Sequence, residues 1–243
     1  MDYSFLQCGE GALTVHLGDG IDPAINRRVT ALQGAIGSAG LRGITDLIPA
    51  YADLTVCYDC TVISAKALQR QLRRLLDSLS VAGQDRRRVF RLPVCYGGDY
   101  WPDLDFVCHH SGLTAQEVIA LHSAPDYLIY MLGFLPGFAY LGGLDPRLHT
   151  PRLDSPRTCI PAGSVGIGGA QTGVYPLASP GGWQLLGRTP VSVFDRQRQE
   201  PILYRAGDLV RFVPISPAEY EEIARAVAAG TYTVQVEEVP VCD

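Results

Sequence analysis

Hydrophobic positions in the first part of the chain recur with the two periods of regular secondary structure. Alternating residues over 12–18 predict a strand that ends in a Gly-Asp-Gly turn. Asp22 and Pro23 have the residue types of an N-cap and a first helical position, so a helix is expected to begin there. Its apolar residues are spaced four, three and four apart, on one helical face: Ile25, Val29, Leu32 and Ile36.

The segments that follow complete a small α+β pattern. Residues 44–59 have the character of two short strands that are interrupted near Pro49. A second helix is expected from Ser64, with leucines along one side and arginines on the other. We therefore predict an α+β N-terminal domain over residues 1–85. The polar, charged and aperiodic segment 82–89 is the best candidate for its boundary.

Residues 86–243 change to short strands that are punctuated by glycine and proline. A short helix is expected over 102–112, and two further helices begin with capping boxes: Thr114 with Glu117, and Ser216 with Glu219. The expected strands include 89–96, a buried strand at 127–134, and a half-buried, alternating strand at 231–239. Many short strands with such turns predict a barrel or sandwich, so residues 86–243 are expected to form a mainly β domain.

Composition and net charge limit the kinds of molecule that this chain is expected to bind. The 243 residues are 47% hydrophobic and 19% charged, enough apolar material for a real core. A formal net charge of −5 gives no electrostatic reason to expect nucleic acid or an anionic membrane as partner. No apolar stretch is long enough for a transmembrane helix. The seven cysteines are odd in number and scattered, which favours reduced thiols and a cytoplasmic location.

Neither the cysteines nor the histidines form a metal-binding pattern. Cys57 and Cys60 have C-x-x-C spacing, but a zinc site needs a second pair and a redox motif would begin a helix. These two cysteines are therefore expected to be structural. None of the five histidines belongs to an H-E-x-x-H or H-x-H cluster, so no metal site is expected.

The most distinctive stretch is glycine-rich and runs from Ile160 to Trp183, inside a segment without charge from Thr158 to Gly187. It contains no lysine and so cannot be a P-loop, and the third glycine of a dinucleotide motif is replaced by Gln171. Its bulky apolar residues argue against a flexible linker. We expect two short strands around a tight turn, with glycine where backbones approach closely.

This stretch and its flanks supply the candidate site. Neutral hydrogen-bonding side chains lie within it and arginines flank it; the candidates are Gln171, Thr172 and Tyr175, with Arg152, Arg157 and Arg188. Guanidinium groups beside exposed backbone N–H groups suit a carboxylate or phosphate ligand. The alternative is that the glycines only form turns and the arginines are solvated. From the residues alone, His122 is expected to be a structural histidine at the end of a short helix.

A run of motifs between Tyr127 and Pro190 resembles the motifs of a known protein family. The motifs are GFLPGFAYL, IPAGSVGIGG, QTGVYP, SPGGW and GRTP, preceded by LTAQEVIALHS and followed by RAGDLVRF. In these motifs the chain closely resembles the family of 5-oxoprolinase B subunits, also called the KipI or allophanate hydrolase subunit 1-like family. The first eighty residues match this family only in length and α+β character.

The resemblance implies a fold and an activity. It implies a cyclophilin-like β-barrel after the α+β domain. It also implies two partners, the C and A subunits of 5-oxoprolinase, and the C subunit is built on a related barrel. The three subunits would open 5-oxo-L-proline to L-glutamate with ATP, and hence Mg²⁺, and this chain is expected to be inactive alone. In that scheme the B and C subunits activate the lactam by phosphorylation.

The resemblance also suggests roles for residues. His122 precedes the family's G-F-x-P-G-F motif, which suggests an acid/base or orienting group, and with Arg188 it is our candidate for catalysis. The candidates for substrate binding are Arg152, Arg157, Gln171, Thr172 and Tyr175. A site that the C subunit completes fits these residues equally well.

Three other interpretations remain open at this point. The chain could be a regulatory protein that inhibits a sensor histidine kinase, as KipI-like proteins do. It could be a subunit for urea- or allophanate-related amide metabolism. A prolyl isomerase is suggested by the fold only, and fold does not imply function.

Overall fold

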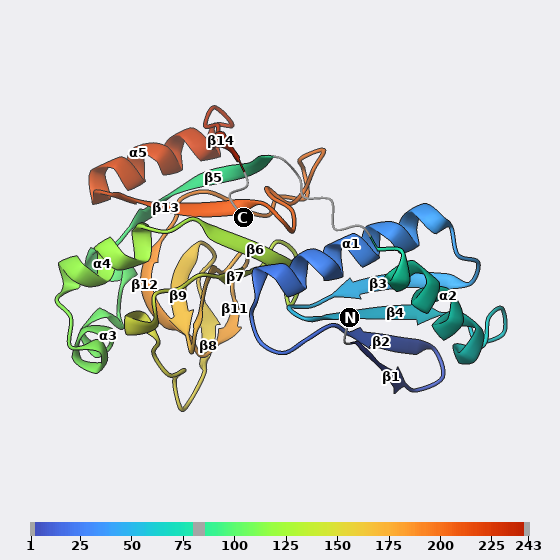
Figure 1. The fold of residues 1–243 in the computed structure, drawn as a ribbon. Coiled ribbons are helices and arrows are strands. Elements are labelled where there is room, and N and C mark those ends of the chain that lie inside the picture. Colours follow the sequence, from blue (N-terminus) through green and yellow to red (C-terminus); the bar gives the residue numbers. More distant parts are fainter. Residues whose placement is uncertain (1–2, 80–85, 241–243) are drawn as a thin grey trace. The chain divides into compact units, whose positions relative to one another are not determined.

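The computed structural model describes residues 3–79 and 86–240 of the chain. Contacts within the chain group its residues into two compact units, which we call the N-terminal unit (1–84) and the C-terminal unit (85–243) (Figure 1). The boundary predicted at 85/86 adjoins residues 80–85, which lie outside the described residues. The division into two domains therefore stays a prediction.

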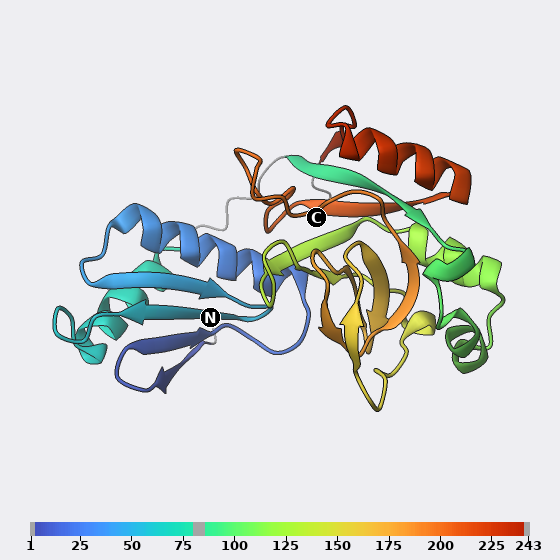
Figure 2. The same ribbon diagram turned by 180° about the vertical axis from the view of Figure 1, so that it is seen from behind.

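A four-stranded antiparallel sheet and two helices make up the N-terminal unit. The strands are ordered β1-β2-β4-β3, with bounds Ser4–Cys8 (β1), Ala12–His16 (β2), Ile44–Pro49 (β3) and Asp53–Tyr58 (β4). Both helices, α1 (Pro23–Ala39) and α2 (Ala65–Asp77), pack on the same face of this sheet, as Figures 1 and 2 show. The alternation of β2 and β4 explains this, because every second residue is buried against the helices.

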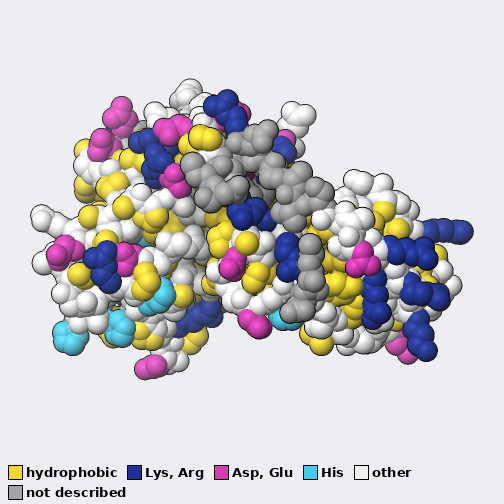
Figure 3. Space-filling view, viewed as in Figure 1, with side chains coloured by type: hydrophobic (Ala, Val, Ile, Leu, Met, Phe, Trp, Pro, Cys, Tyr) yellow, Lys and Arg dark blue, Asp and Glu magenta, His cyan; other side chains and the backbone are white. Residues whose placement is uncertain are grey.

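Both helices begin where the sequence predicts. The Asp22 carboxylate accepts hydrogen bonds from the N–H groups of the first turn of α1, and Ser64 caps α2 in the same way. Gly40 ends α1 in the left-handed conformation (φ 56°). Basic side chains gather over the N-terminal unit in Figure 3, and the exposed ones on α2 are Lys66, Arg70, Arg73 and Arg74. Strand β1 is an element that the sequence analysis did not predict.

An eight-stranded sheet organises the C-terminal unit. Its order is β10-β9-β12-β5-β13-β6-β7, and β14 also pairs with β5. The bounds are Arg86–Cys95 (β5), Tyr127–Leu132 (β6), Ala139–Gly142 (β7), Ser164–Gly168 (β9), Gln171–Val174 (β10), Gln184–Arg188 (β12), Leu209–Ile215 (β13) and Gln235–Pro240 (β14). Two short strands, β8 (Arg157–Ile160) and β11 (Ser179–Gly181), form a separate pair.

The sheet curls until its two ends lie close to each other. A Cβ placed on Gly173 in β10 would lie 3.2 Å from the carbonyl oxygen of Ala139 in β7, at the other end of the strand order. The sheet is therefore a nearly closed barrel, and its interior is filled by apolar side chains from most of its strands. Strand β13 runs parallel to β5, while the other described neighbours in this sheet are antiparallel.

Three helices accompany this sheet: α3 (Leu104–Ser111), α4 (Ala115–Ser123) and α5 (Pro217–Ala228). Short 3₁₀ turns lie at Gly98–Tyr100 and Pro146–Leu148. Both predicted capping boxes are formed, at the starts of α4 and α5. The predicted strand near the C-terminus exists as β14, but its expected half-buried face is wrong, because five of its six residues are exposed. This strand pairs with β5 through its backbone and places little side-chain surface in the core.

No helix in residues 3–79 and 86–240 combines the length and the apolar character that crossing a membrane requires.

Candidate functional site

The glycine-rich stretch folds as the β9–β10 hairpin, with Gly168 opposite Gln171 beside the turn. A Cβ on Gly166 would lie 2.7 Å from the carbonyl oxygen of Gln184 in β12. A Cβ on Gly168 would collide with the ring of Trp183. Glycine is thus required where β9 packs against β12 and its neighbouring indole, and the predicted close approach is confirmed.

Two hollows, each of about 140 Å³, are both lined by Tyr175. The first, which we call the Arg188 hollow, is lined by Tyr175, Arg188, Thr189, Val191, Ser192 and Tyr220, among others. The second, the aromatic hollow, is lined by Phe134, Phe138, Tyr140, Arg152, Tyr175 and Trp183, together with residues 180–182. Tyr175 belongs to both. The predicted site residues Arg152 and Arg188 therefore lie in different hollows that share one wall.

Arg188 lies at the end of β12. Its Nε donates to the carbonyl oxygen of Ala162 at 3.0 Å, and its guanidinium carbon lies 5.9 Å from the ring centre of Tyr100. No acidic side chain among the described residues forms an ion pair with it. Its charge is thus available to an anion in the Arg188 hollow.

Arg157, by contrast, is held by the protein itself. Its Nη2 donates to Oδ1 of Asp103 at 2.6 Å, and its Nη1 donates to the carbonyl oxygen of Trp183 at 3.3 Å. The other carboxylate oxygen of Asp103 accepts from the backbone N–H of Leu185 at 2.6 Å. Asp103 is buried, so this ion pair connects the start of α3 to β8 and β12. Arg157 lines neither hollow.

Arg152 makes a weaker hydrogen bond than Arg157 does. Its Nη2 donates to the side-chain oxygen of Gln171 at 3.4 Å, the long end of a hydrogen bond to a neutral group. No described acidic residue pairs with it. The structure therefore brings Arg152, Gln171 and Tyr175 to one region.

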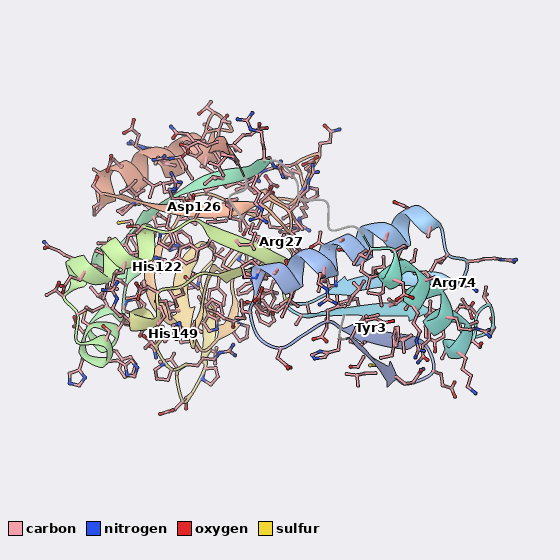
Figure 4. The ribbon with its side chains drawn as sticks, in the orientation of Figure 1. Tyr3, Arg27, Arg74, His122, Asp126 and His149 are labelled. Atoms are coloured by element: carbon pink, nitrogen blue, oxygen red, sulfur yellow. The ribbon has the colours of Figure 1, made fainter. Side chains whose placement is uncertain are left out.

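His122 lies at the end of α4, where this helix meets the sheet (Figure 4), and is completely buried. The hydroxyl of Thr172 donates to the carbonyl oxygen of Gly166 at 3.0 Å. That hydroxyl has only one hydrogen, so the 2.7 Å contact with His122 must use a hydrogen on Nε2 of the imidazole. Nδ1 of His122 is then an acceptor, and the hydroxyl of Tyr96 donates to it at 2.7 Å.

This chain of hydrogen bonds fixes a neutral imidazole. Burial lowers the pKa of His122 to about 3, because a charged ring would lose its hydration. The ring also stacks on Phe212 with centroids 4.7 Å apart. Both ring nitrogens of His122 and the hydroxyl of Thr172 are engaged inside the protein, so the geometry suits an orienting role better than proton transfer to a substrate.

Several groups that define the region have no recognisable signal in the sequence. Tyr96 and Asp103 are distant in sequence from His122 and Arg157, and nothing in local patterning pairs them. Phe134 belongs to the GFLPGFAYL motif, and it is 65% exposed and the one described non-glycine residue with positive φ (63°). Among the described residues there is no group of three or more His, Cys, Asp or Glu side chains arranged to hold a metal ion. The six described cysteines are free, and Cys242 lies outside the described residues.

Comparison with known proteins decides the family. Residues 3–204 match the family described as carboxyltransferase domain, subdomain C and D. The chain is 41% identical over 228 residues to the 5-oxoprolinase B subunit of Bacillus subtilis, and the match covers 90% of this chain and 95% of that protein. This chain belongs to the family of 5-oxoprolinase B subunits.

Another member, the 5-oxoprolinase B subunit of Escherichia coli O157:H7, is 45% identical over 207 residues, 85% of this chain and 93% of that protein. The solved structure of TTHA0988 has 41% identity and a TM-score of 0.74 over 84% of this chain, which spans 40% of that longer protein. Kluyveromyces lactis urea carboxylase superposes with a TM-score of 0.82 over 98% of this chain, which spans 24% of that protein. At 23% identity, the last match shows a shared fold alone.

Proposed function

We propose that this chain is the B subunit of an ATP-dependent 5-oxoprolinase that acts with the C and A subunits to open 5-oxo-L-proline to L-glutamate. The observation that carries the proposal is its membership of the B-subunit family along nearly the whole chain. Within the chain, two hollows that share Tyr175 each contain an arginine without a described acidic partner. This suits a substrate and a phosphoryl group that both carry negative charge.

The chemistry explains why positive charge matters here. A lactam carbonyl is a poor electrophile until its oxygen is phosphorylated, and phosphoryl transfer depends on positioning and electrostatic stabilisation more than on a protein nucleophile. Arg188 would stabilise the charge on the transferred group, through guanidinium N–H groups that point to no described carboxylate. His122 would act as an orienting group, by holding Thr172 and the β9–β10 hairpin in place. The Arg157–Asp103 pair would support the same region without contacting substrate.

The remaining expectations belong to the same proposal. ATP with Mg²⁺ would be used by the assembled complex, and this chain alone would not turn over substrate. The barrel would be cyclophilin-like, and the protein would work in the cytoplasm. For the urea- or allophanate-related alternative, the likeness to urea carboxylase supports the fold only. No feature of the described residues favours inhibition of a histidine kinase or prolyl isomerisation.

The test is 5-oxo-L-proline-dependent ATP turnover by the purified chain, alone and reconstituted with the C and A subunits. We expect turnover that depends on 5-oxo-L-proline in the full set and none with this chain alone. Absence of turnover in the full set, with all three proteins folded and associated, would contradict the proposed function. Replacing 5-oxo-L-proline by urea or allophanate in the same assay tests the amide-metabolism alternative.

A further inference from the structure

The walls of the aromatic hollow include a cluster of aromatic rings that contact one another. The ring of Phe138 is the common member of this cluster and makes edge-to-face contacts with four other rings, at centroid distances between 5.2 and 5.8 Å: Phe134, Tyr140, Tyr175 and Trp183. Each such contact favours one relative orientation of the two rings. The rings therefore form a preformed apolar surface beside open space.

One of these rings is held outward by a strained turn. The N–H of Leu135 donates to the carbonyl oxygen of Gly133 at 2.7 Å, across Phe134 with its φ of 63°. This is a γ-turn with positive φ at its central residue, which is rare and costly for a residue other than glycine. The ring that it presents is 65% exposed, so core burial does not compensate for the strain. Strained backbone conformations of this kind cluster at ligand-binding positions.

The hollow also has a polar side. Arg152 lines it, with a neutral contact at 3.4 Å and no described acidic partner. Burial raises the pKa of Tyr175, while a hydrogen bond from the backbone N–H of Trp183 and the charges of Arg152 and Arg157 oppose that effect. The phenol is thus protonated at neutral pH and can donate its hydrogen to a ligand.

We propose that the aromatic hollow binds the substrate as a small, flat ring that carries one carboxylate, with the ring against Phe134 and Phe138 and the carboxylate on Arg152. This assignment rests on the proposed function, which makes that ligand 5-oxo-L-proline. A volume of about 140 Å³ suits a ligand of this size, since drug-sized pockets are about 300 Å³ or more. The assignment leaves the Arg188 hollow, which Tyr175 also lines, for the phosphoryl group.

The first test separates recognition of the carboxylate from recognition of the ring. The Arg152→Gln variant is assembled with the C and A subunits, and its turnover of 5-oxo-L-proline is compared with that of the wild-type complex. 2-Pyrrolidinone, the same lactam without a carboxylate, is used as a competitive inhibitor of both complexes. We expect the KM for 5-oxo-L-proline to rise about 10- to 100-fold, with kcat within about twofold, because a charge-assisted bond is lost from both ground and transition states. The inhibition constant of 2-pyrrolidinone should change less than about twofold. Arg196→Gln, an exposed arginine outside both hollows, is the matched control and should leave both values unchanged.

The second test uses the strain at Phe134. Phe134→Gly removes the ring and adopts positive φ without strain, and this relief offsets the greater entropy of the unfolded chain. We therefore expect an unchanged or higher melting temperature together with a KM raised about tenfold or more. A structural role for the ring would instead lower the melting temperature. Normal KM values in both Arg152→Gln and Phe134→Gly, within an active complex, would overturn this assignment alone. A wild-type complex without turnover would overturn the proposed function and this assignment with it.

Discussion

Two regions of the molecule are rich in functional groups but use them in opposite ways. One is the buried chain of hydrogen bonds from Tyr96 through His122 to Thr172, and the other is the aromatic hollow. In the buried chain each hydrogen has an acceptor within the protein, and the imidazole is fully enclosed. In the hollow, Arg152 has no described counter-charge and Phe134 is exposed on a strained turn. The first arrangement is complete without a ligand, whereas the second is not.

This difference separates residues that support the site from residues that meet a ligand. A satisfied buried network contributes to stability and to the uniqueness of the packing, and it is costly to interrupt. An arginine whose described side-chain contact is one long hydrogen bond to a neutral group contributes little to folding, so its place beside aromatic walls calls for another explanation. Mutations in the two regions should therefore divide between loss of stability and loss of affinity.

The largest expected effect comes from interrupting the buried chain. His122→Ala leaves the hydroxyl of Tyr96 without its acceptor and opens a cavity beside Phe212, so we expect a loss of about 3 kcal/mol in the free energy of unfolding. Urea denaturation monitored by circular dichroism measures it. His109→Ala, an exposed histidine on the neighbouring helix α3, should lose less than about 0.5 kcal/mol. Unchanged stability of His122→Ala with abolished turnover would instead assign His122 to the chemistry.

The same residue predicts a pH dependence of somewhat smaller size. The pKa of His122 is about 3 when folded against an ordinary value of 6.5, so between these values the unfolded chain binds the additional proton. The contribution of the neutral ring is complete above pH 6.5 and declines as the pH falls, by about 1.4 kcal/mol per unit.

Comparison with a variant that cannot titrate isolates this effect from other groups. Between pH 7 and pH 5, we expect the wild-type chain to lose about 2 kcal/mol more stability than His122→Gln, whose amide can donate and accept in the same place. Urea denaturation of both proteins at the two pH values measures the difference. Equal losses in both would show that His122 does not remain neutral in the folded protein.

How far these regions can be predicted from sequence depends on how local their causes are. The starts of α1, α2, α4 and α5 are decided by a cap residue and its first turn, and the sequence identifies each of them correctly. The close approach at Gly166 and Gly168 is likewise visible, because glycine alternates along one short strand. These are signals between residues a few positions apart.

The buried chain and the Arg157–Asp103 pair depend instead on distant contacts. Tyr96 is 26 residues from His122, and Asp103 is 54 residues from Arg157. No periodicity links such positions, so the sequence presents Arg152, Arg157 and Arg188 as three equivalent flanking cations. Only the fold distinguishes Arg157, which is ion-paired, from the two arginines that have no acidic partner among the described residues.

The difference between Arg157 and Arg152 gives the smallest of the predicted effects on stability. It also allows two arginine variants to be compared directly with each other. Arg157→Gln leaves the buried carboxylate of Asp103 without its cation, and we expect a loss of about 1 to 2 kcal/mol in the free energy of unfolding, because the pair is only partly shielded from water. Arg152→Gln replaces an exposed side chain and should change stability by less than about 0.5 kcal/mol. Urea denaturation of the two variants under identical conditions compares them directly. If Arg152→Gln lowered the free energy of unfolding as much as Arg157→Gln, Arg152 would be a residue that supports the fold. The contrast between supporting and ligand-binding residues would then be wrong for Arg152, the residue that is proposed to bind the carboxylate.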